Sequence, residues 1–251
     1  MFSYDFSGRA ALVTGAGGGM GEAIALALLR SGAAVTGIDL KARPDSYAGH
    51  DDRFAYEQGD LRDLAFVEKV AGAAYRRSGR LDYLANVAGV LWFGRDKSAL
   101  EMDLAVWDEV MAINLKSFVH TSRAAAPLMR KTGGGAMVHV STIQWMRGDP
   151  QPQDAYQASK AAVSALSRSL AMQLAGDNIR SNTICPGATL TPMQARWATE
   201  EIRRQVASHV PLKRIGTAED MAQATLFLLS DASSYVTGID LPVDGGLLLR
   251  S

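Results

Sequence analysis

The chain has 251 residues, 47% of them hydrophobic, and its 26 basic and 26 acidic residues give a formal net charge of zero, which argues against a nucleic-acid partner. Its one cysteine, Cys185, excludes an intrachain disulfide framework and fits a reducing compartment. The amino terminus lacks the pattern of a signal peptide and no apolar stretch is long enough to span a membrane, so we expect a soluble, cytoplasmic protein.

Short apolar runs alternate with helical periodicity along the whole chain. This alternation predicts an α/β fold with one doubly wound parallel sheet rather than two domains. In chain order we expect a strand at 9–14, a helix at 22–30, a strand at 32–39, a strand at 53–59, a helix at 64–78, a strand and its turn at 81–89, one or two helices at 100–131 interrupted near Pro127, a strand at 136–140, a helix that carries Tyr156, a strand at 179–184, helices at 199–210 and 218–229, and a strand at 239–243.

A glycine-rich segment, TGAGGGMG, lies between the first strand and the first helix. It fits G-x-x-x-G-x-G through Gly15, Gly19 and Gly21, and not G-x-G-x-x-G, because Met20 stands where the third glycine would fall. Such a turn lets the backbone approach a pyrophosphate and turns free N–H groups toward negative charge. Glycine-rich turns also occur without ligands, but the position between strand and helix favours a dinucleotide site.

The second strand ends in a carboxylate, Asp39. An acid at this place can accept hydrogen bonds from an adenosine ribose and repel a 2′-phosphate, which favours NAD over NADP. Gly18 points the same way, because a basic residue there could have met a 2′-phosphate. Against this, Asp39 could simply open the next turn, and Lys41 and Arg43 could offset its repulsion.

Tyr156 and Lys160 are four residues apart on one helix and therefore share a face. A nearby cation favours the phenolate, so the pair can make a base of a tyrosine, although such a pair alone is more often a solvated helix face. Ser141 and Thr142 follow the fifth strand, at the edge where open α/β sheets bind ligands. Asn114, considered alone, fits a structural hydrogen-bonding role better than a catalytic one.

Together these features resemble the classical short-chain dehydrogenase/reductase family over essentially the whole chain. The resemblance implies a single domain over 1–251 with a Rossmann-type, seven-stranded parallel sheet flanked by helices on both faces, a nicotinamide cofactor, no metal, and a homotetramer. The signatures that carry it are TGAGGGMG at 14–21, the Asp60-Leu61 pair, NVAG at 86–89, Asn114, the Tyr156-Lys160 pair, Pro186-Gly187 and Asp244-Gly245-Gly246.

The resemblance also implies roles for individual residues. Tyr156 would be the general acid/base, Lys160 would lower its pKa and hold the nicotinamide ribose, and Asn114 would support a water in the proton relay. The implied cofactor residues are Gly15, Gly19, Met20 and Gly21 at the pyrophosphate, Asp39 at the adenosine ribose with Leu40 beside it, Asp60 and Leu61 at the adenine, Asn86, Ala88 and Gly89 along the groove, and Pro186, Gly187, Thr189 and Thr191 at the nicotinamide.

One position departs from the family pattern. The family has a serine thirteen residues before the tyrosine, and here that place is Ile143. Aligning the fifth strand instead puts Thr142 in the catalytic place, with one extra residue in the loop 147–153. Ser141 is the other candidate, and either hydroxyl can donate a hydrogen bond to a carbonyl or alkoxide oxygen.

Large apolar groups dominate the segments that we expect near the nicotinamide, including a substrate loop at about 188–212. They favour a hydrophobic or cyclic alcohol or ketone over a small charged acid, although they could instead cover the core or a subunit contact. The expected pocket residues are Trp92, Ile143, Gln144, Trp145, Met193 and Trp197.

The opening segment and the PGATLTPMQ segment look most like bacterial NAD-dependent enzymes that oxidise cyclic alcohols. A dehydrogenase of the 2,3-dihydro-2,3-dihydroxybenzoate type is one alternative, but the segment after NVAG, with Trp92 and Phe93, offers no basic group for a substrate carboxylate. A 3-oxoacyl reductase-like ketoreductase is another. Outside the enzymes, a catalytically silent dinucleotide-binding sensor remains open, although both Tyr156 and Lys160 are present.

Overall fold

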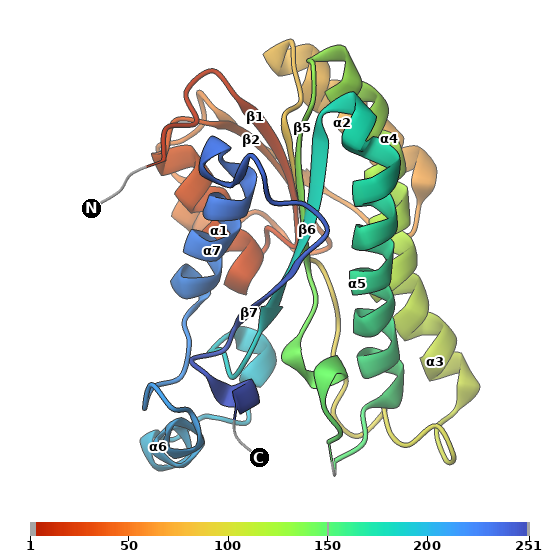
Figure 1. Cartoon of the computed structure of the whole chain (residues 1–251), viewed down its shortest axis with the longest axis vertical. Helices are drawn as coiled ribbons and strands as arrows, with labels where there is room; N and C mark the ends of the chain where they lie inside the picture. Colours follow the sequence, from red (N-terminus) through yellow and green to blue (C-terminus); the bar gives the residue numbers. More distant parts are fainter. Residues whose placement is uncertain (1–3, 150, 250–251) are drawn as a thin grey trace.

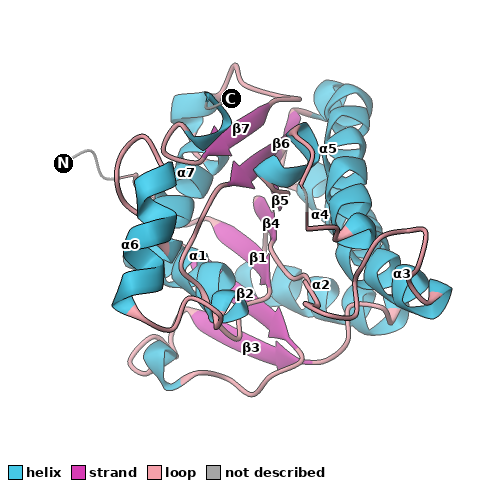
Figure 2. Ribbon diagram, turned by 90° about the horizontal axis from the view of Figure 1, so that it is seen from below, coloured by secondary structure: helices cyan, strands magenta, loops and turns pink. Residues whose placement is uncertain are grey.

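A computed structural model describes residues 4–149 and 151–249, so the ends of the range 1–251 expected for one domain lie outside the described residues. The seven strands form one parallel sheet in the order β3-β2-β1-β4-β5-β6-β7 (Figures 1 and 2). The strands are β1 Ala10–Thr14, β2 Ala34–Asp39, β3 Phe54–Gln58, β4 Tyr83–Asn86, β5 Gly135–Val140, β6 Ile179–Pro186 and β7 Asp240–Val243.

Helices cover both faces of the sheet, which confirms the Rossmann-type fold (Figure 2). The apolar sides of α1 and α7 pack on one face, and those of α2, α4 and α5 pack on the other. The helices are α1 Gly19–Arg30, α2 Leu64–Ser78, α3 Leu104–Met111, α4 Ser117–Lys131, α5 Asp154–Leu174, α6 Glu200–His209 and α7 Ala218–Leu229.

The interruption expected near Pro127 is wrong. Helix α4 runs through Pro127, and the irregularity lies before it, in a π-helical turn at Ala112–Lys116 that joins α3 to α4. A π turn leaves a local mismatch in the ladder of backbone hydrogen bonds and is often found at functional sites. This one carries Asn114, whose side chain is completely buried.

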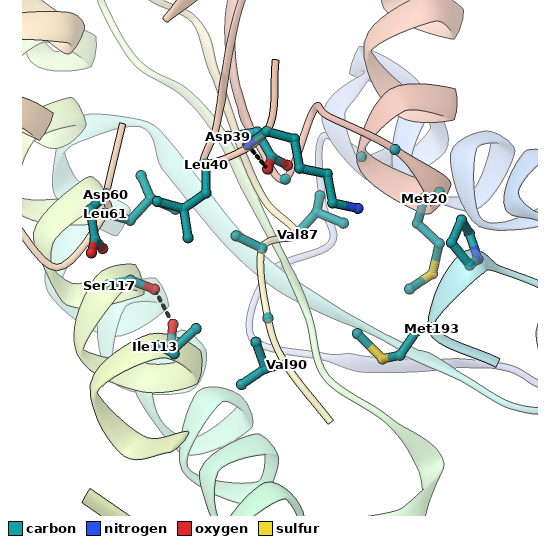
Figure 3. A pocket seen from close by; sticks show the side chains of 18 of the residues that line it. Met20, Asp39, Leu40, Asp60, Leu61, Val87, Val90, Ile113, Ser117 and Met193 are labelled. Atoms are coloured by element: carbon teal, nitrogen blue, oxygen red, sulfur yellow. Dashed lines mark hydrogen bonds between the residues drawn. The ribbon is translucent and has the colours of Figure 1, made fainter. Parts of the chain in front are cut away.

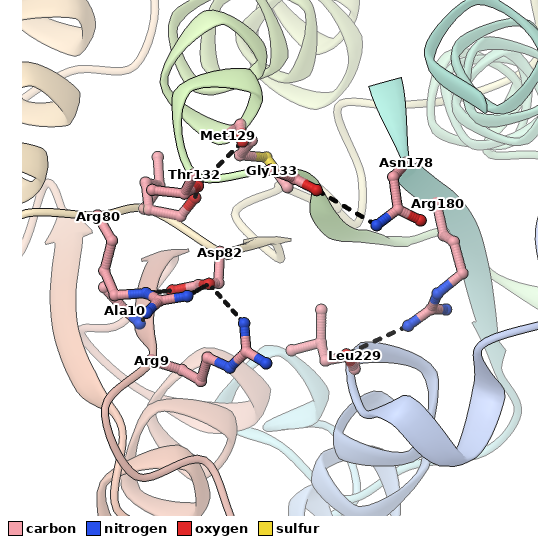
Figure 4. A network of polar contacts seen from close by, with 11 residues as sticks. Arg9, Ala10, Arg80, Asp82, Met129, Thr132, Gly133, Asn178, Arg180 and Leu229 are labelled. Atoms are coloured by element: carbon pink, nitrogen blue, oxygen red, sulfur yellow. Dashed lines mark hydrogen bonds and ion pairs between the residues drawn. The ribbon is translucent and has the colours of Figure 1, made fainter. Parts of the chain in front are cut away.

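The two ends of the strands differ in character. At the amino-terminal ends, Asp82 accepts hydrogen bonds from the side chains of Arg9 and Arg80 and from the backbone N–H of Ala10 (Figure 4). Nearby, the Arg180 guanidinium donates to the carbonyl of Leu229 near the end of α7. At these ends of the strands the charged side chains are therefore paired with one another or with the backbone, as a structural network is.

The carboxyl ends of all seven strands lie together on the opposite side of the molecule, and the strand order reverses between β1 and β4. Loops diverge at such a reversal and leave a crevice, which is where open α/β sheets bind ligands. The candidate site is therefore expected in this crevice. Among the helices of residues 4–149 and 151–249, none combines the length and apolarity needed to cross a bilayer.

Candidate active site

The glycine-rich turn after β1 has room only for glycine at two points. Gly15 has φ +72°, and a Cβ there would lie 2.9 Å from the backbone nitrogen of Ala88. A Cβ on Gly21 would collide with the carbonyl oxygen of Gly15. Helix α1 then begins at Gly19, and its N-cap residue Gly18 has no side chain to occupy the first N–H groups. These donors are available to an anion, as a pyrophosphate requires.

A cavity of about 280 Å³ extends from this turn along the crevice (Figure 3). Met20 and Met193 lie on one side of it, and Leu40 and Leu61 lie on the other. The residues predicted to bind the cofactor that line it are Gly15, Gly19, Met20, Gly21, Asp39, Leu40, Asp60, Leu61, Ala88, Gly89 and Thr191. The glycine turn, the uncapped helix start and the carboxylate of Asp39 together fit a dinucleotide.

The carboxylate of Asp39 is fixed by backbone donors. One oxygen accepts from Gly17 N at 2.9 Å and the other accepts from Lys41 N at 2.9 Å. The Lys41 ammonium also lies near the turn, 3.9 Å from the position that a Cβ on Gly18 would take. The end of β2 therefore places the negative charge of Asp39 beside the positive charge of Lys41.

Asp60 lies at the other side of this cavity. Its carboxylate accepts a fork of hydrogen bonds from the Arg62 side chain, at 2.9 and 2.7 Å, and these bonds hold its pKa below the usual range. Leu61 beside it is buried. A flat ring would meet an apolar wall here, with a charged rim.

A second cavity, of about 190 Å³, adjoins the first and shares Met20, Gly89, Thr191 and Met193 with it. It lies over the carboxyl ends of β5 and β6. The predicted residues that line it are Met20, Gly89, Ser141, Thr142, Ile143, Gln144, Tyr156, Lys160, Pro186, Gly187, Thr189, Thr191, Met193 and Trp197.

Tyr156 and Lys160 enter this cavity from the first turns of α5. The buried carboxylate of Asp96 holds the start of the helix, accepting from Ala155 N at 3.1 Å and from Tyr156 N at 2.8 Å. The Lys160 ammonium donates to the Val140 carbonyl at 2.8 Å and lies 5.9 Å from the centre of the Tyr156 ring. One turn of helix thus brings the phenol and the ammonium together.

Burial dominates the ionisation of both groups. It raises the pKa of Tyr156 to about 12, and the opposing effect comes from a hydrogen bond with Thr142. Burial likewise lowers the pKa of Lys160 to about 8. At neutral pH the phenol is therefore protonated, and the hydrogen bond with Thr142 holds its pKa below the value that burial alone would give.

The two candidate hydroxyls have different partners. Ser141 donates to the backbone carbonyl of Lys160 at 2.7 Å and accepts from Ser164 at 3.3 Å, so its hydroxyl ties β5 to α5. The Thr142 hydroxyl bonds to Tyr156 and accepts from Gln144 N at 3.2 Å. Of the two hydroxyls, Thr142 is the one that lowers the pKa of Tyr156, which favours it as the partner of the phenol at a shared reacting oxygen.

Asn114 acts as a clamp behind these groups. Its side chain accepts from Val90 N at 2.8 Å and donates to Val90 O at 3.0 Å and to Ser159 at 3.1 Å. A Cβ on Gly89 would lie 3.1 Å from the Asn114 side-chain oxygen and 3.3 Å from the Lys160 ammonium. Glycine therefore allows the loop after β4 to pass close to both residues.

Asn86 lines neither cavity and instead belongs to a buried polar chain. It accepts from Thr121 at 2.7 Å, and its amide nitrogen lies 3.1 Å from Nδ1 of His139. Nε2 of His139 lies 3.2 Å from the Ser181 hydroxyl. Burial lowers the pKa of His139 to about 4, so the ring is neutral and the amide donates to Nδ1. Asn86 supports the strand ends from within.

Two residues expected in the substrate pocket lie elsewhere. Trp92 packs against the apolar side of α3, with the Arg95 guanidinium 4.2 Å from the centre of its ring. Trp145 is outside both cavity linings, and the Arg168 guanidinium lies 5.9 Å from the centre of its ring.

Sequence reasoning missed three charged residues of the second cavity, Arg147, Asp149 and Arg196. The Arg196 guanidinium lies over the ring of Phe93, 4.2 Å from its centre. From the sequence we assign no basic group to a substrate carboxylate, because the segment after NVAG offers none. An arginine in the substrate loop was the available signal, but its spacing does not tell which loop it meets.

Comparisons with known proteins agree with this arrangement. A family model described as "Enoyl-(Acyl carrier protein) reductase" matches residues 15–248. The chain is 37% identical to 3-oxoacyl-[acyl-carrier-protein] reductase of Thermotoga maritima, over 96% of this chain and 98% of that protein. It is 35% identical to 2,3-dihydro-2,3-dihydroxybenzoate dehydrogenase of Escherichia coli, over 98% and 99%.

Among solved structures, aldohexose dehydrogenase of Thermoplasma acidophilum aligns over 99% of this chain and 96% of its own, with a TM-score of 0.88 at 26% identity. The family match and the relatives cover almost all of the chain, and the sheet order and the glycine-rich turn agree with them. The chain therefore belongs to the classical short-chain dehydrogenase/reductase family, whose members are oxidoreductases that use nicotinamide cofactors.

Proposed function

We propose that this protein is an NAD-dependent oxidoreductase that interconverts a secondary alcohol and its ketone, with Tyr156 as general acid/base. One observation carries the proposal: Tyr156, Thr142 and Lys160 line a cavity that adjoins the glycine-lined groove. Positioning of this kind supplies a large part of the rate in hydride-transfer enzymes.

The nicotinamide, when bound, supplies or accepts the hydride. In the direction of reduction, the Tyr156 phenol donates its proton to the ketone oxygen, and the Thr142 hydroxyl donates a hydrogen bond to the same oxygen as charge develops on it. In the direction of oxidation, Tyr156 accepts the hydroxyl proton. Lys160 holds its positive charge beside the phenol and favours the phenolate that is left after proton donation.

NAD is the cofactor that we propose, because the Asp39 carboxylate at the end of β2 would repel a 2′-phosphate. Its two backbone hydrogen bonds keep it facing the groove. The Lys41 ammonium near Gly18 opposes this preference, so we expect NADP to bind more weakly rather than not at all.

The substrate that we propose is a cyclic or hydrophobic alcohol. Apolar side chains from three separate loops line the second cavity, among them Leu91, Ile143, Met193 and Trp197. We further propose that 1–251 is one domain, that 188–212 is its substrate loop, and that four chains assemble into a homotetramer, which light scattering after gel filtration would measure.

The test is a spectrophotometric assay of the purified protein with NAD or NADP and a panel of cyclic secondary alcohols. We expect NADH to form with wild type and its formation to be lost in Tyr156→Phe. Thermal unfolding with added NADH serves as the control that the variant still folds and binds cofactor. Tight NADH binding by both proteins with no turnover of any alcohol would favour the silent dinucleotide-binding sensor instead.

A further inference from the structure

Arg196 lines the cavity that holds Tyr156 and contacts the loop after β4. It belongs to the substrate loop, and its guanidinium lies 4.2 Å from the centre of the Phe93 ring and 5.7 Å from that of Trp197. Its Nε donates to the Gln194 side chain at 3.0 Å. Arg196 lines the same cavity as Tyr156, and its guanidinium has further N–H donors besides Nε.

A second arginine, Arg147, lines the cavity from the loop after β5. Within residues 4–149 and 151–249, neither it nor Arg196 forms an ion pair with a carboxylate. The acid of this cavity, Asp149, already accepts from the Gln144 amide at 3.1 Å and from Gln151 N at 3.0 Å. Its charge offsets one arginine, and the Lys160 ammonium adds another positive charge further in.

The cavity therefore carries more positive than negative charge. Burial lowers the pKa of Arg196, while the charge of Asp149 acts in the opposite direction. Arg147 and Arg196 are both exposed and have no ion-pair partner among the described residues, so an anion that enters the cavity can pair with them without displacing a carboxylate. Arginine is the side chain best suited to this, because its planar fork matches a carboxylate.

We propose that the substrate of this protein carries a carboxylate and that Arg196, assisted by Arg147, binds it, so that the reacting compound is a cyclic hydroxy or keto acid rather than a neutral alcohol. This inference rests on the proposed function and narrows its substrate class. The apolar groups of the cavity hold the ring, and the two arginines fix which carbon faces Tyr156.

The first test needs no turnover. Benzoate and benzamide have nearly the same shape and differ in charge, so their binding to the protein, with and without NAD, is compared by calorimetry. We expect wild type to bind benzoate about 10- to 100-fold more tightly than benzamide, as a charge-assisted hydrogen bond allows. In Arg196→Gln that ratio should fall toward one, and in Arg147→Gln it should fall less.

Two variants serve as controls. Arg204→Gln removes the same charge from an exposed position on α6 outside the cavity, and Tyr156→Phe keeps the cavity while removing the acid/base group. Both should retain the preference for benzoate. Equal binding of the two probes by wild type, or no benzoate binding at millimolar concentration, would overturn the proposal. An equal loss of benzoate and benzamide binding in Arg196→Gln would also overturn it, because Arg196 would then only hold its loop against Phe93.

The second test uses turnover of 3-oxocyclohexanecarboxylate and its carboxamide with NADH. We expect the acid to have the higher kcat/KM in wild type, and Arg196→Gln to lower that value about 10- to 100-fold for the acid while sparing the amide. Charge-selective binding without turnover of any ketone would count against the proposed oxidoreductase function and leave the carboxylate site standing. Turnover of both compounds without charge preference would do the reverse.

Discussion

The two hydroxyls at the end of β5 offer the sharpest test of the active-site geometry. Thr142→Val keeps the shape of the side chain and removes the hydroxyl that bonds to Tyr156. Ser141→Ala removes the neighbouring hydroxyl, whose hydrogen bond at 2.7 Å goes to the Lys160 carbonyl. The two variants therefore separate a group that touches the reacting oxygen from one that holds the backbone.

We expect Thr142→Val to lower mainly kcat and Ser141→Ala to lower mainly the free energy of unfolding. Losing a donor to the developing oxyanion costs about 10²- to 10³-fold in kcat, so Thr142→Val should lose that much activity. Its cost in stability is small, about 0.5–1 kcal/mol, because the Thr142 side chain caps only the short turn Ile143–Met146. Ser141→Ala should lose about 1 kcal/mol of stability and change kcat by only a few-fold.

The assay is steady-state kinetics with an alcohol that wild type oxidises, paired with urea unfolding of each variant. Thr142→Ser, which restores a hydroxyl, should recover most of the activity. A larger loss of kcat in Ser141→Ala than in Thr142→Val would refute the assignment of Thr142 and return the role to Ser141.

The pH dependence, the cofactor preference and the buried ion pairs can each be tested separately. With the pKa of Tyr156 near 12 and that of Lys160 near 8, alcohol oxidation should rise with pH because the phenolate fraction grows, and ketone reduction should fall above about pH 8 because Lys160 loses its charge. Profiles of kcat/KM against pH measure both trends, and an oxidation rate that falls from pH 7 to 8 would contradict the expectation. Asp39→Ala should raise kcat/KM for NADP relative to NAD by about tenfold or more, because it removes a like charge, and an unchanged ratio in initial rates would speak against the NAD assignment. Asp82→Ala should lower the free energy of unfolding, measured in urea, by about 2 kcal/mol, because it leaves the buried N–H of Ala10 unpaired. The control Asp51→Ala, at an exposed ion pair, should lower it by less than about 1 kcal/mol, and equal losses would contradict the role of burial.

Much of the fold could be predicted because its signals are local. The bounds of α2 and α7 were expected as they are found, since Asp63 caps the first helix and Thr217 forms a capping box with Asp220 at the second. The start of α1 was expected at residue 22 and lies at Gly19. Glycines carry no apolar period, so the pattern could not show that the helix already begins within the turn.

Pro127 shows where a local rule fails. Proline removes one backbone donor and usually breaks a helix, yet α4 continues through it. The flanking residues Ala125, Ala126 and Met129 are buried against the sheet, and this packing holds the helix together. The π turn before α4 was not predictable, because no residue pattern distinguishes one extra residue in a helical turn from regular helix.

The candidate site was predictable where one element carries the whole signal. Tyr156 and Lys160 lie on one helix, and the glycine turn lies between one strand and one helix, so spacing alone brings each group together. The contact between Arg196 and Phe93 joins two loops that are far apart in the sequence. Hydrophobic periodicity does not indicate which loops contact each other, so it could not show that Arg196 of the substrate loop supplies a basic group near the segment after NVAG.

The positions of the reacting groups depend on clamps that never touch a substrate. Asp96 holds the first turn of α5 by two backbone donors, Asn114 ties the loop after β4 to α5, and Ser141 ties the end of β5 to the backbone of Lys160. All three clamps bind the same helix, from three directions. Because a helix moves as a rigid body, the distance between the phenol of Tyr156 and the Thr142 hydroxyl is set by these bonds together. The polar residues that sequence reasoning would assign to chemistry or to structure are therefore one system, in which the structural members decide whether the chemical members meet.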